Sequence, residues 1–263
     1  MSRAATIRTP LFVPANRPER FTKAAQSGCD AVILDLEDAV ATDAKDAARD
    51  ALETGFTDLP VLVRINATGT PWHAQDIRAV AGMDIAAVIL PKSECPDDMA
   101  AVVAALGGIP VIALIESARG IANARALAAV PGVVRLAFGS IDYCADLGCE
   151  HLRDILLPVR SELVLASRLA GIAAPIDGVT VQLDDPAVSF DDARHARALG
   201  MTGKLCIHPK QIAEVARAFA PTTAEIDWAT RVLASGNGAA NVDGAMVDEP
   251  VRIRARAILA HQA

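Results

Sequence analysis

The chain has 263 residues, of which 52% are hydrophobic and only 3% aromatic, so it can bury a large core of small and branched side chains. Its formal net charge of −7 argues against a general nucleic-acid binder, although an anionic small ligand needs only a local basic cluster. No apolar run approaches the roughly 18 residues of a membrane span, and no signal core follows the first residues. The five cysteines lack zinc-ligand spacing. We therefore expect a cytoplasmic protein that binds neither nucleic acid nor membrane.

Short apolar runs alternate with Ala-rich, charged segments along most of the chain. The runs predict buried strands at Pro10–Pro14, Ala31–Asp35, Val61–Ile65, Ala86–Leu90, Val111–Ile115, Val133–Phe138, Pro175–Val179 and Lys204–Ile207. The segments after them predict helices at Arg17–Ser27, Asp43–Thr54, Pro71–Ala81, Pro96–Leu106, Gly120–Ala129, Leu156–Ala170, Phe190–Leu199 and Pro209–Phe219. This alternation predicts an α/β fold, a (β/α)₈ TIM barrel. An open doubly wound sheet is the competitor, but PANRPER follows the first run instead of a GxGxxG fingerprint.

Two stretches exceed what a barrel needs. The insertion Asp142–Leu157 begins where the sixth strand is expected to end. After the eighth helix, the chain predicts a helix at Thr222–Ala234, a hairpin or loop that turns at Asp243–Gly244, and a helix at Val251–His261. We expect residues 1–220 to form the barrel and residues 221–263 to form a helical extension that packs on the barrel or on a neighbouring subunit.

Charged side chains gather at the carboxyl ends of the predicted strands, where barrels of this type build their active sites. They include Asp35, Glu37, Asp38, Arg64, Lys92, Glu116, Arg119, Asp142, Asp177 and His208. A ring of carboxylates would repel itself, and a hard cation such as Mg²⁺ resolves this repulsion by taking one or two of them as ligands. Glu116 and Asp142 end adjacent strands, so they are the predicted metal ligands.

The neighbouring charges suit supporting roles. Asp35, Glu37 and Asp38 are placed to hold metal-bound waters. Arg64 is placed to pair with a substrate carboxylate through two hydrogen bonds.

Structural alternatives stay open for most of these residues. Asp142 could cap the helix of the insertion, and Asp38 could favour the dipole of a helix that starts in DLEDAV. Three others have equally plain alternatives: Lys92 as a solvated loop residue, His208 as a helix N-terminal residue, and Asp177 as a buried structural partner.

Seven motifs in this order resemble the HpcH/HpaI aldolase and citrate lyase β-subunit superfamily. They are LFVPANRPERFTKA, DAVILDLEDAV followed by Lys45, VRIN, LPK, ALIESARG, AFGSID and GKLCIHPKQ. The resemblance is strongest to the CitE-like branch, which includes malyl-CoA and citramalyl-CoA lyases, and it covers nearly the whole chain. It identifies the family and leaves the substrate open.

The resemblance implies a TIM barrel, usually a homotrimer or a dimer of trimers. It implies that Glu116 and Asp142 hold Mg²⁺, with Mn²⁺ as the alternative metal, and that Arg64 binds the carboxylate of the keto-acid product. It also implies that Arg17, Arg20 and Lys23 meet the phosphates of coenzyme A. The partners expected are therefore an acyl-CoA and a keto acid.

The activity implied is cleavage or condensation of a β-hydroxyacyl-CoA, such as citramalyl-CoA or malyl-CoA, by a metal-dependent carbon–carbon lyase. A citrate lyase β-subunit-like enzyme, a class II aldolase without coenzyme A, and a non-catalytic subunit are the alternatives. Longer relatives carry a further C-terminal domain with a catalytic carboxylate, which this chain is expected to lack. Asp35, Glu37 or a metal-bound water is then left as the general acid or base.

Overall fold

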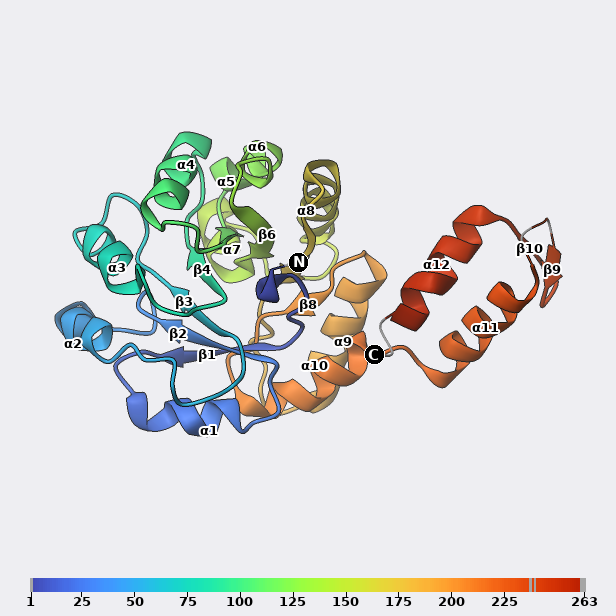
Figure 1. The fold of residues 1–263 in the computed structure, drawn as a ribbon, viewed down its shortest axis with the longest axis horizontal. Helices are drawn as coiled ribbons and strands as arrows, with labels where there is room; N and C mark the ends of the chain where they lie inside the picture. Colours follow the sequence, from blue (N-terminus) through green and yellow to red (C-terminus); the bar gives the residue numbers. More distant parts are fainter. Residues whose placement is uncertain (1, 237, 239, 261–263) are drawn as a thin grey trace. The chain divides into compact units, whose positions relative to one another are not determined.

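The computed structural model describes residues 2–236, 238 and 240–260. Its centre is an eight-stranded parallel sheet in which the strands follow one another in chain order (Figure 1). The strands are β1 (Pro10–Pro14), β2 (Ala31–Asp35), β3 (Val61–Arg64), β4 (Ala87–Leu90), β5 (Val111–Ile115), β6 (Val133–Phe138), β7 (Ala173–Asp177) and β8 (Gly203–Lys204). Every residue of β2, β4 and β5 is buried, as expected for parallel strands covered on both faces.

Backbone hydrogen bonds between the last and first strands close this sheet into a barrel. The amide of Lys204 donates to the carbonyl of Arg8 at 2.8 Å. The amide of Phe12 donates to the carbonyl of Cys206 at 2.9 Å, and the amide of Cys206 donates to the carbonyl of Pro10 at 2.9 Å. The predicted TIM barrel is therefore confirmed.

Helices connect the strands and surround the barrel (Figure 1). They are α1 (Phe21–Ala25), α2 (Lys45–Asp50), α3 (His73–Val80), α4 (Pro96–Ala105), α5 (Ala118–Ala122), α6 (Ala124–Ala128), α7 (Ser140–Leu147), α8 (Leu157–Ala170), α9 (Pro186–Ala198) and α10 (Ile212–Phe219). The 3₁₀ turns η2 (Pro18–Arg20), η3 (Thr42–Ala44) and η4 (Pro209–Gln211) precede α1, α2 and α10. Within the described part of the chain, no helix combines the length and apolar character that crossing a bilayer requires.

Some boundaries differ from the prediction. The helix expected at Gly120–Ala129 is divided at Asn123 into α5 and α6. β8 is limited to Gly203–Lys204, and the residues beyond it contact β1 through a single bridge between Leu11 and Cys206. The strand expected at Pro175–Val179 is β7 at Ala173–Asp177; Gly178 follows it, and a Cβ there would lie 2.3 Å from Ser140 Oγ.

The amino-terminal end of the barrel is filled by the start of the chain. A 3₁₀ turn, η1 (Arg3–Ala5), precedes β1, and Ala4 and Ile7 belong to the buried cluster inside the barrel. Arg135 on β6 is fully buried there, and its Nη1 donates to the carbonyl oxygen of Ile7 at 2.6 Å. A guanidinium that satisfies backbone carbonyls in this way costs less to bury than an unpaired one.

The chain divides into two compact units, Met1–Ala216 and Arg217–Ala263. The second contains α11 (Thr223–Ala234), α12 (Glu249–Ala260) and an antiparallel hairpin of β9 (Ala240–Val242) and β10 (Ala245–Val247). The hairpin turns at Asp243 and Gly244, both with positive φ, as the sequence predicts. His261, the last residue of the expected final helix, lies outside the described residues. The packing of the extension on the barrel or on another subunit stays a prediction.

Candidate active site

Glu116 directly follows β5 and is buried at the carboxyl end of the barrel, with 4% of its surface exposed. Its Oε1 accepts a hydrogen bond of 2.7 Å from the backbone amide of Lys92. Burial, with a further contribution from the charge of Glu37, raises its pKa to about 8. Glu116 is therefore not a strand-end residue that reaches solvent. Because burial disfavours its ionised form, a nearby cation would stabilise the Glu116 carboxylate.

Asp142 lies in the first turn of α7, after β6, and shares a cavity with Glu116. The cap position of α7 is occupied by Gly139 and has no side-chain cap hydrogen bond, so the capping role considered for Asp142 is not observed. Its side chain is 38% exposed, and its Oδ2 lies 3.3 Å from Lys92 Nζ. One carboxylate is thus buried and fixed, while the other is partly open to the solvent.

Arg64, at the end of β3, is paired with Asp35, at the end of β2. Two parallel hydrogen bonds of 2.7 Å join Nε to Oδ1 and Nη2 to Oδ2. Asp35 also accepts the backbone amides of Glu37 and Ala39, so its oxygens are fully used. The guanidinium lies 4.7 Å from the centroid of the Phe12 ring. Arg64 therefore presents a fixed positive charge to the cavity, with Nη1 as the edge not bonded to Asp35.

Glu37 lies close to both Arg64 and Lys92. Its Oε2 is 3.0 Å from Arg64 Nη1, but the geometry of that contact does not make a hydrogen bond. Its Oε1 accepts from Lys92 Nζ at 2.7 Å. Burial raises the pKa of Glu37, and the charges of Arg64 and Lys92 oppose this rise. Asp38 is more open, with 57% of its side chain exposed, and it precedes η3 by several residues, so it is not a helix-dipole partner.

A cavity of about 430 Å³, which we call the mouth cavity, brings most of these groups together. Its polar lining consists of Asp35, Asp38, Arg64, Glu116, Ser140 and Asp142, and its apolar lining includes Phe12, Leu114, Phe138, Val179 and Leu205. The structure therefore places five predicted site residues, from three strand ends and α7, around one space.

Other residues singled out in the sequence lie elsewhere. Asp177 is fully buried and paired with Arg160 at 2.7 Å and with Lys204 at 2.9 Å, as in its structural interpretation. His208 caps η4 and accepts from the amide of Lys210. These two residues are parts of the scaffold.

The predicted coenzyme A residues Arg17, Arg20 and Lys23 lie on η2 and α1, outside the described lining of the mouth cavity. All three are exposed. Arg17 Nε forms an ion pair of 2.7 Å with Glu19. They form a basic segment beside the end of β1.

Two lysines make more contacts with the site residues than the sequence indicates. Lys92, for which the sequence leaves a solvated loop residue as the alternative, contacts Glu116, Glu37 and Asp142. Buried Lys45 on α2 donates to the carbonyls of Leu36 and Glu37, each at 2.7 Å, and so fixes the DLEDAV loop. The signal for Lys45 in the sequence is its place after the motif DAVILDLEDAV.

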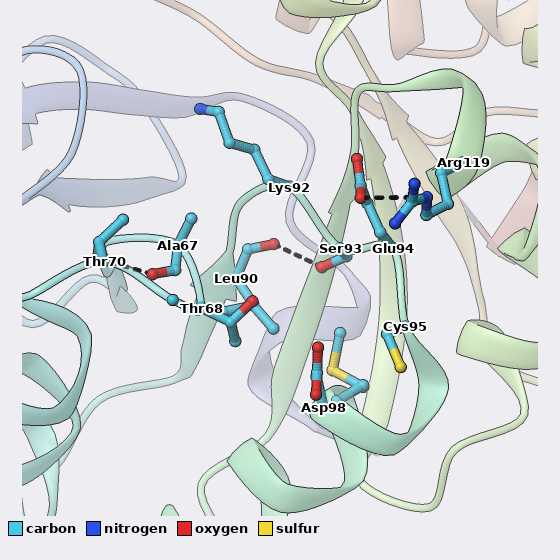
Figure 2. Close-up of a pocket in the computed structure, with 12 residues that line it drawn as sticks. Ala67, Thr68, Thr70, Leu90, Lys92, Ser93, Glu94, Cys95, Asp98 and Arg119 are labelled. Atoms are coloured by element: carbon cyan, nitrogen blue, oxygen red, sulfur yellow. Dashed lines mark hydrogen bonds and ion pairs between the residues drawn. The ribbon is translucent and has the colours of Figure 1, made fainter.

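A second space, the lateral cavity, lies beside the site and also measures about 430 Å³. It is lined by residues 67–70 and by Ser93, Glu94, Cys95, Asp98 and Arg119 (Figure 2). Arg119, expected near the metal ligands, instead lies 3.8 Å from Glu94 here. Figure 2 shows the Lys92 side chain pointing away from Glu94 and Arg119.

The donors of the mouth cavity suit one kind of metal site. Among the described residues, no group of three or more His, Cys, Asp and Glu side chains is arranged to hold an ion. The cavity instead offers two hard carboxylates, Glu116 and Asp142. Cations that keep several waters in an octahedral shell need no more than one or two protein carboxylates.

Comparisons with known proteins agree with this arrangement. The chain matches the sequence model described as HpcH/HpaI aldolase/citrate lyase over residues 8–209. It is 42% identical to a citrate lyase subunit beta-like protein of Mycobacterium tuberculosis, over 95% of this chain and 93% of the relative. It is 34% identical to a (3S)-malyl-CoA thioesterase of Cereibacter sphaeroides, over 98% and 95% of the two chains. The crystal structure of M. tuberculosis CitE with magnesium, acetoacetate and coenzyme A has a TM-score of 0.85 and 41% identity, covering 98% of both chains. As its strand-end motifs predict, the chain belongs to the HpcH/HpaI aldolase/citrate lyase family.

Proposed function

We propose that this protein is a metal-dependent carbon–carbon lyase that cleaves, or in reverse condenses, a β-hydroxyacyl-CoA such as citramalyl-CoA or malyl-CoA. The products of cleavage are an acyl-CoA and an α-keto acid. The observation that carries the proposal is the pair Glu116 and Asp142, which face one cavity beside the fixed charge of Arg64.

Glu116 and Asp142 would hold Mg²⁺, or Mn²⁺ as the alternative, and the substrate and water would supply the remaining ligands. The ion supplies Lewis acidity that polarises the substrate oxygen destined to become a carbonyl. The magnesium complex of the M. tuberculosis relative supports this assignment.

Arg64, which lines the mouth cavity and is held by Asp35, would orient the carboxylate of the keto acid. Its Nη1, 3.0 Å from Glu37 Oε2, is the nitrogen beside this site that is not bonded to Asp35. Asp35 is a poor proton carrier because its oxygens already accept four hydrogen bonds. Its role is to position Arg64. Glu37, whose pKa is raised by burial, is the better candidate of the two for holding a proton.

Arg17, Arg20 and Lys23 would meet the phosphates of coenzyme A, in keeping with the coenzyme A complex of the relative. All three are exposed and cationic, as a binding site for a mobile polyphosphate requires.

A second candidate activity is hydrolysis of the thioester after cleavage or in its place, because relatives with 33–34% identity are named (3S)-malyl-CoA thioesterase. A citrate lyase β-subunit-like activity and a class II aldolase without coenzyme A belong to the same chemistry and remain the alternatives. A non-catalytic subunit is disfavoured by the intact pair Glu116 and Asp142.

The deciding experiment is an assay of purified protein over a panel of acyl-CoA substrates, with and without EDTA. Free thiol and keto acid are measured separately, so that hydrolysis and carbon–carbon cleavage are told apart. We expect keto acid release that EDTA abolishes and Mg²⁺ restores. Thiol release without keto acid would favour the thioesterase, and activity toward free hydroxy-keto acids alone would favour the aldolase.

We also propose a homotrimer or a dimer of trimers. Exposed apolar side chains are concentrated between β6 and the end of α8: Ile141, Leu147, Leu152, Ile155, Leu157, Leu165 and Leu169. Exposed apolar side chains that form a contiguous patch favour self-association. Light scattering should give a trimer or hexamer mass, and Ile155→Glu with Leu169→Glu should reduce it. A monomer in the unmodified protein would contradict this proposal.

A further inference from the structure

Lys92 has a backbone conformation that side chains rarely adopt. Its φ is +49°, in the left-handed region that favours glycine. The turn around it is fixed, because buried Ser93 donates its amide to Leu114 and its hydroxyl to Leu90. A Cβ on Gly120 would lie 2.8 Å from the Ser93 carbonyl oxygen, so α5 covers this turn closely. Strain of this kind is retained where the surrounding structure determines it, often at functional sites.

The left-handed turn gives Lys92 two separate tasks. Its backbone amide donates to Glu116 Oε1 at 2.7 Å. Its side chain points away from Glu94 and Arg119 (Figure 2), and Nζ lies 2.7 Å from Glu37 Oε1 and 3.3 Å from Asp142 Oδ2. A glycine at residue 92 would donate the same backbone hydrogen bond to Glu116 without strain. The contacts of the ammonium with Glu37 and Asp142 must therefore explain why a lysine stands here.

Charge at the mouth of the barrel is unbalanced. Five carboxylates gather there, Asp35, Glu37, Asp38, Glu116 and Asp142, against three cations: Arg64 and Lys92, which are paired with members of this group, and buried Lys45, whose charge interacts with Asp35, Glu37 and Asp38. Arg64 is held by Asp35. The ammonium of Lys92 is the cation that reaches Asp142, one of the two proposed metal ligands.

We propose that Lys92 is a positioning residue that sets the balance between metal and keto acid at this site. Its ammonium competes with a divalent cation for Asp142, which weakens metal binding when no substrate is present. The same charge offsets the excess of carboxylates, which favours entry of an anionic keto acid. Removal of the ammonium should therefore change the two affinities in opposite directions. This inference rests on the proposed function, because it takes Glu116 and Asp142 as the metal ligands.

The two directions follow from Coulomb's law. Like charges that share one carboxylate repel each other, and at a partly buried site this repulsion is only partly screened by salt. An anion is repelled by the net negative charge of this site, so each cation in the site favours binding of the anion. A role in folding alone would loosen Asp142 and Glu37, and both affinities would then fall together.

The test is calorimetric titration of the full-length protein with Mg²⁺ alone, followed by titration with pyruvate at saturating Mg²⁺. The variants are Lys92→Met and Lys92→Gly, which remove the ammonium, and Lys92→Arg, which keeps the charge. Lys92→Gly also relieves the backbone strain of the turn, so its affinities are used if Lys92→Met folds poorly. Lys210→Met is the matched control, since Lys210 is an exposed lysine after β8.

We expect Lys92→Gly and Lys92→Met to bind Mg²⁺ about tenfold tighter and pyruvate about tenfold weaker, as one lost charge interaction of ordinary size predicts. Lys92→Arg and Lys210→Met should stay within about twofold of the unmodified protein for both ligands. Equal or weaker Mg²⁺ binding in both Lys92→Gly and Lys92→Met would overturn the inference. If the unmodified protein binds no Mg²⁺, or if Glu116→Gln leaves Mg²⁺ binding intact, the proposed function fails instead.

Discussion

Gly139 and Glu116 are in contact so close that no side chain fits between them. A Cβ on Gly139 would lie 2.2 Å from Glu116 Oε2 and 2.4 Å from its Cβ. The residue before α7 and the carboxylate after β5 therefore fix each other, although 23 positions separate them in the chain, from 116 to 139. The absence of a side chain at residue 139 is a condition for the placement of Glu116.

Gly139→Ala should displace the Glu116 carboxylate and weaken metal binding by about tenfold or more, because the backbone and Glu116 must move apart. Overpacking of a filled interior costs about 1–3 kcal/mol, so the free energy of unfolding should also fall by this amount. Calorimetry with Mg²⁺ and urea unfolding measure the two effects. Gly55→Ala is the control, because no atom lies within 4 Å of a Cβ added there.

The stability of the metal-free protein should depend on the ionisation of Glu116. Its pKa is raised to about 8 in the folded protein from an ordinary value of 4.5, chiefly by burial. The folded state therefore binds more protons than the unfolded state between these two values, and stability falls as pH rises through this window. We expect the melting temperature in EDTA to fall from pH 5 to pH 8, and Mg²⁺ to restore much of it at pH 8.

Glu116→Gln should flatten this pH dependence, since an amide does not ionise, and should abolish Mg²⁺ binding and turnover. A melting temperature in EDTA that still falls equally between pH 5 and pH 8 would assign the effect to other groups, of which buried Glu37 is the first to test.

Replacement of Arg64 should weaken keto-acid binding and lower the free energy of unfolding. Arg64→Ala leaves Asp35 buried and uncompensated, and such a loss costs about 3–5 kcal/mol of stability. Arg64→Lys keeps the charge but not the two parallel bonds, so it should remain folded and bind pyruvate about tenfold more weakly. Urea unfolding and pyruvate titration measure these results. Unchanged pyruvate affinity in Arg64→Lys would remove Arg64 from the substrate site.

The basic segment after β1 should affect coenzyme A substrates alone. The triple change Arg17→Ala, Arg20→Ala and Lys23→Ala should raise KM for the acyl-CoA about tenfold or more and reduce its dependence on salt. Mg²⁺ and pyruvate affinities should not change, since the three residues lie outside the described lining of the mouth cavity. A matched loss of pyruvate affinity would show that the triple change disturbs the barrel itself.

Much of the barrel could be predicted from sequence because its strands are short, apolar and buried on both faces. β1, β2, β5 and β6 have the bounds predicted from their apolar runs. The parallel arrangement then places all strand ends on one face, which is why Glu116, Asp142 and Arg64 could be brought together from sequence alone. β8 was less predictable, since Leu205 and Cys206, which follow it, are as buried as a strand but continue the sheet only through a single bridge.

The roles of individual polar groups depend on contacts that no local pattern reveals. The left-handed backbone of Lys92 is determined by Ser93 and the covering helix α5, so nothing in LPK alone indicates it. Asp177 and His208 were both expected at strand ends, like Glu116. Asp177 ends β7, where it is paired with Arg160 and with buried Lys204, whereas His208 lies beyond β8 and caps the turn η4. The position of a residue at a strand end therefore predicts which part of the barrel it lies in, and its hydrogen bonds and ion pairs determine its role.

The seal formed by Arg135 and the first turn of the chain has a kinetic consequence. Because Arg135 binds the carbonyls of Ala4 and Ile7 and the packed core lies above them, the amino-terminal end of the barrel is closed. In the proposed reaction, both products would then leave through the carboxyl-terminal end, where the mouth cavity lies. Because Glu116 is a proposed metal ligand and is buried, we expect the keto acid to bind before the thioester. Product-inhibition kinetics would test this order.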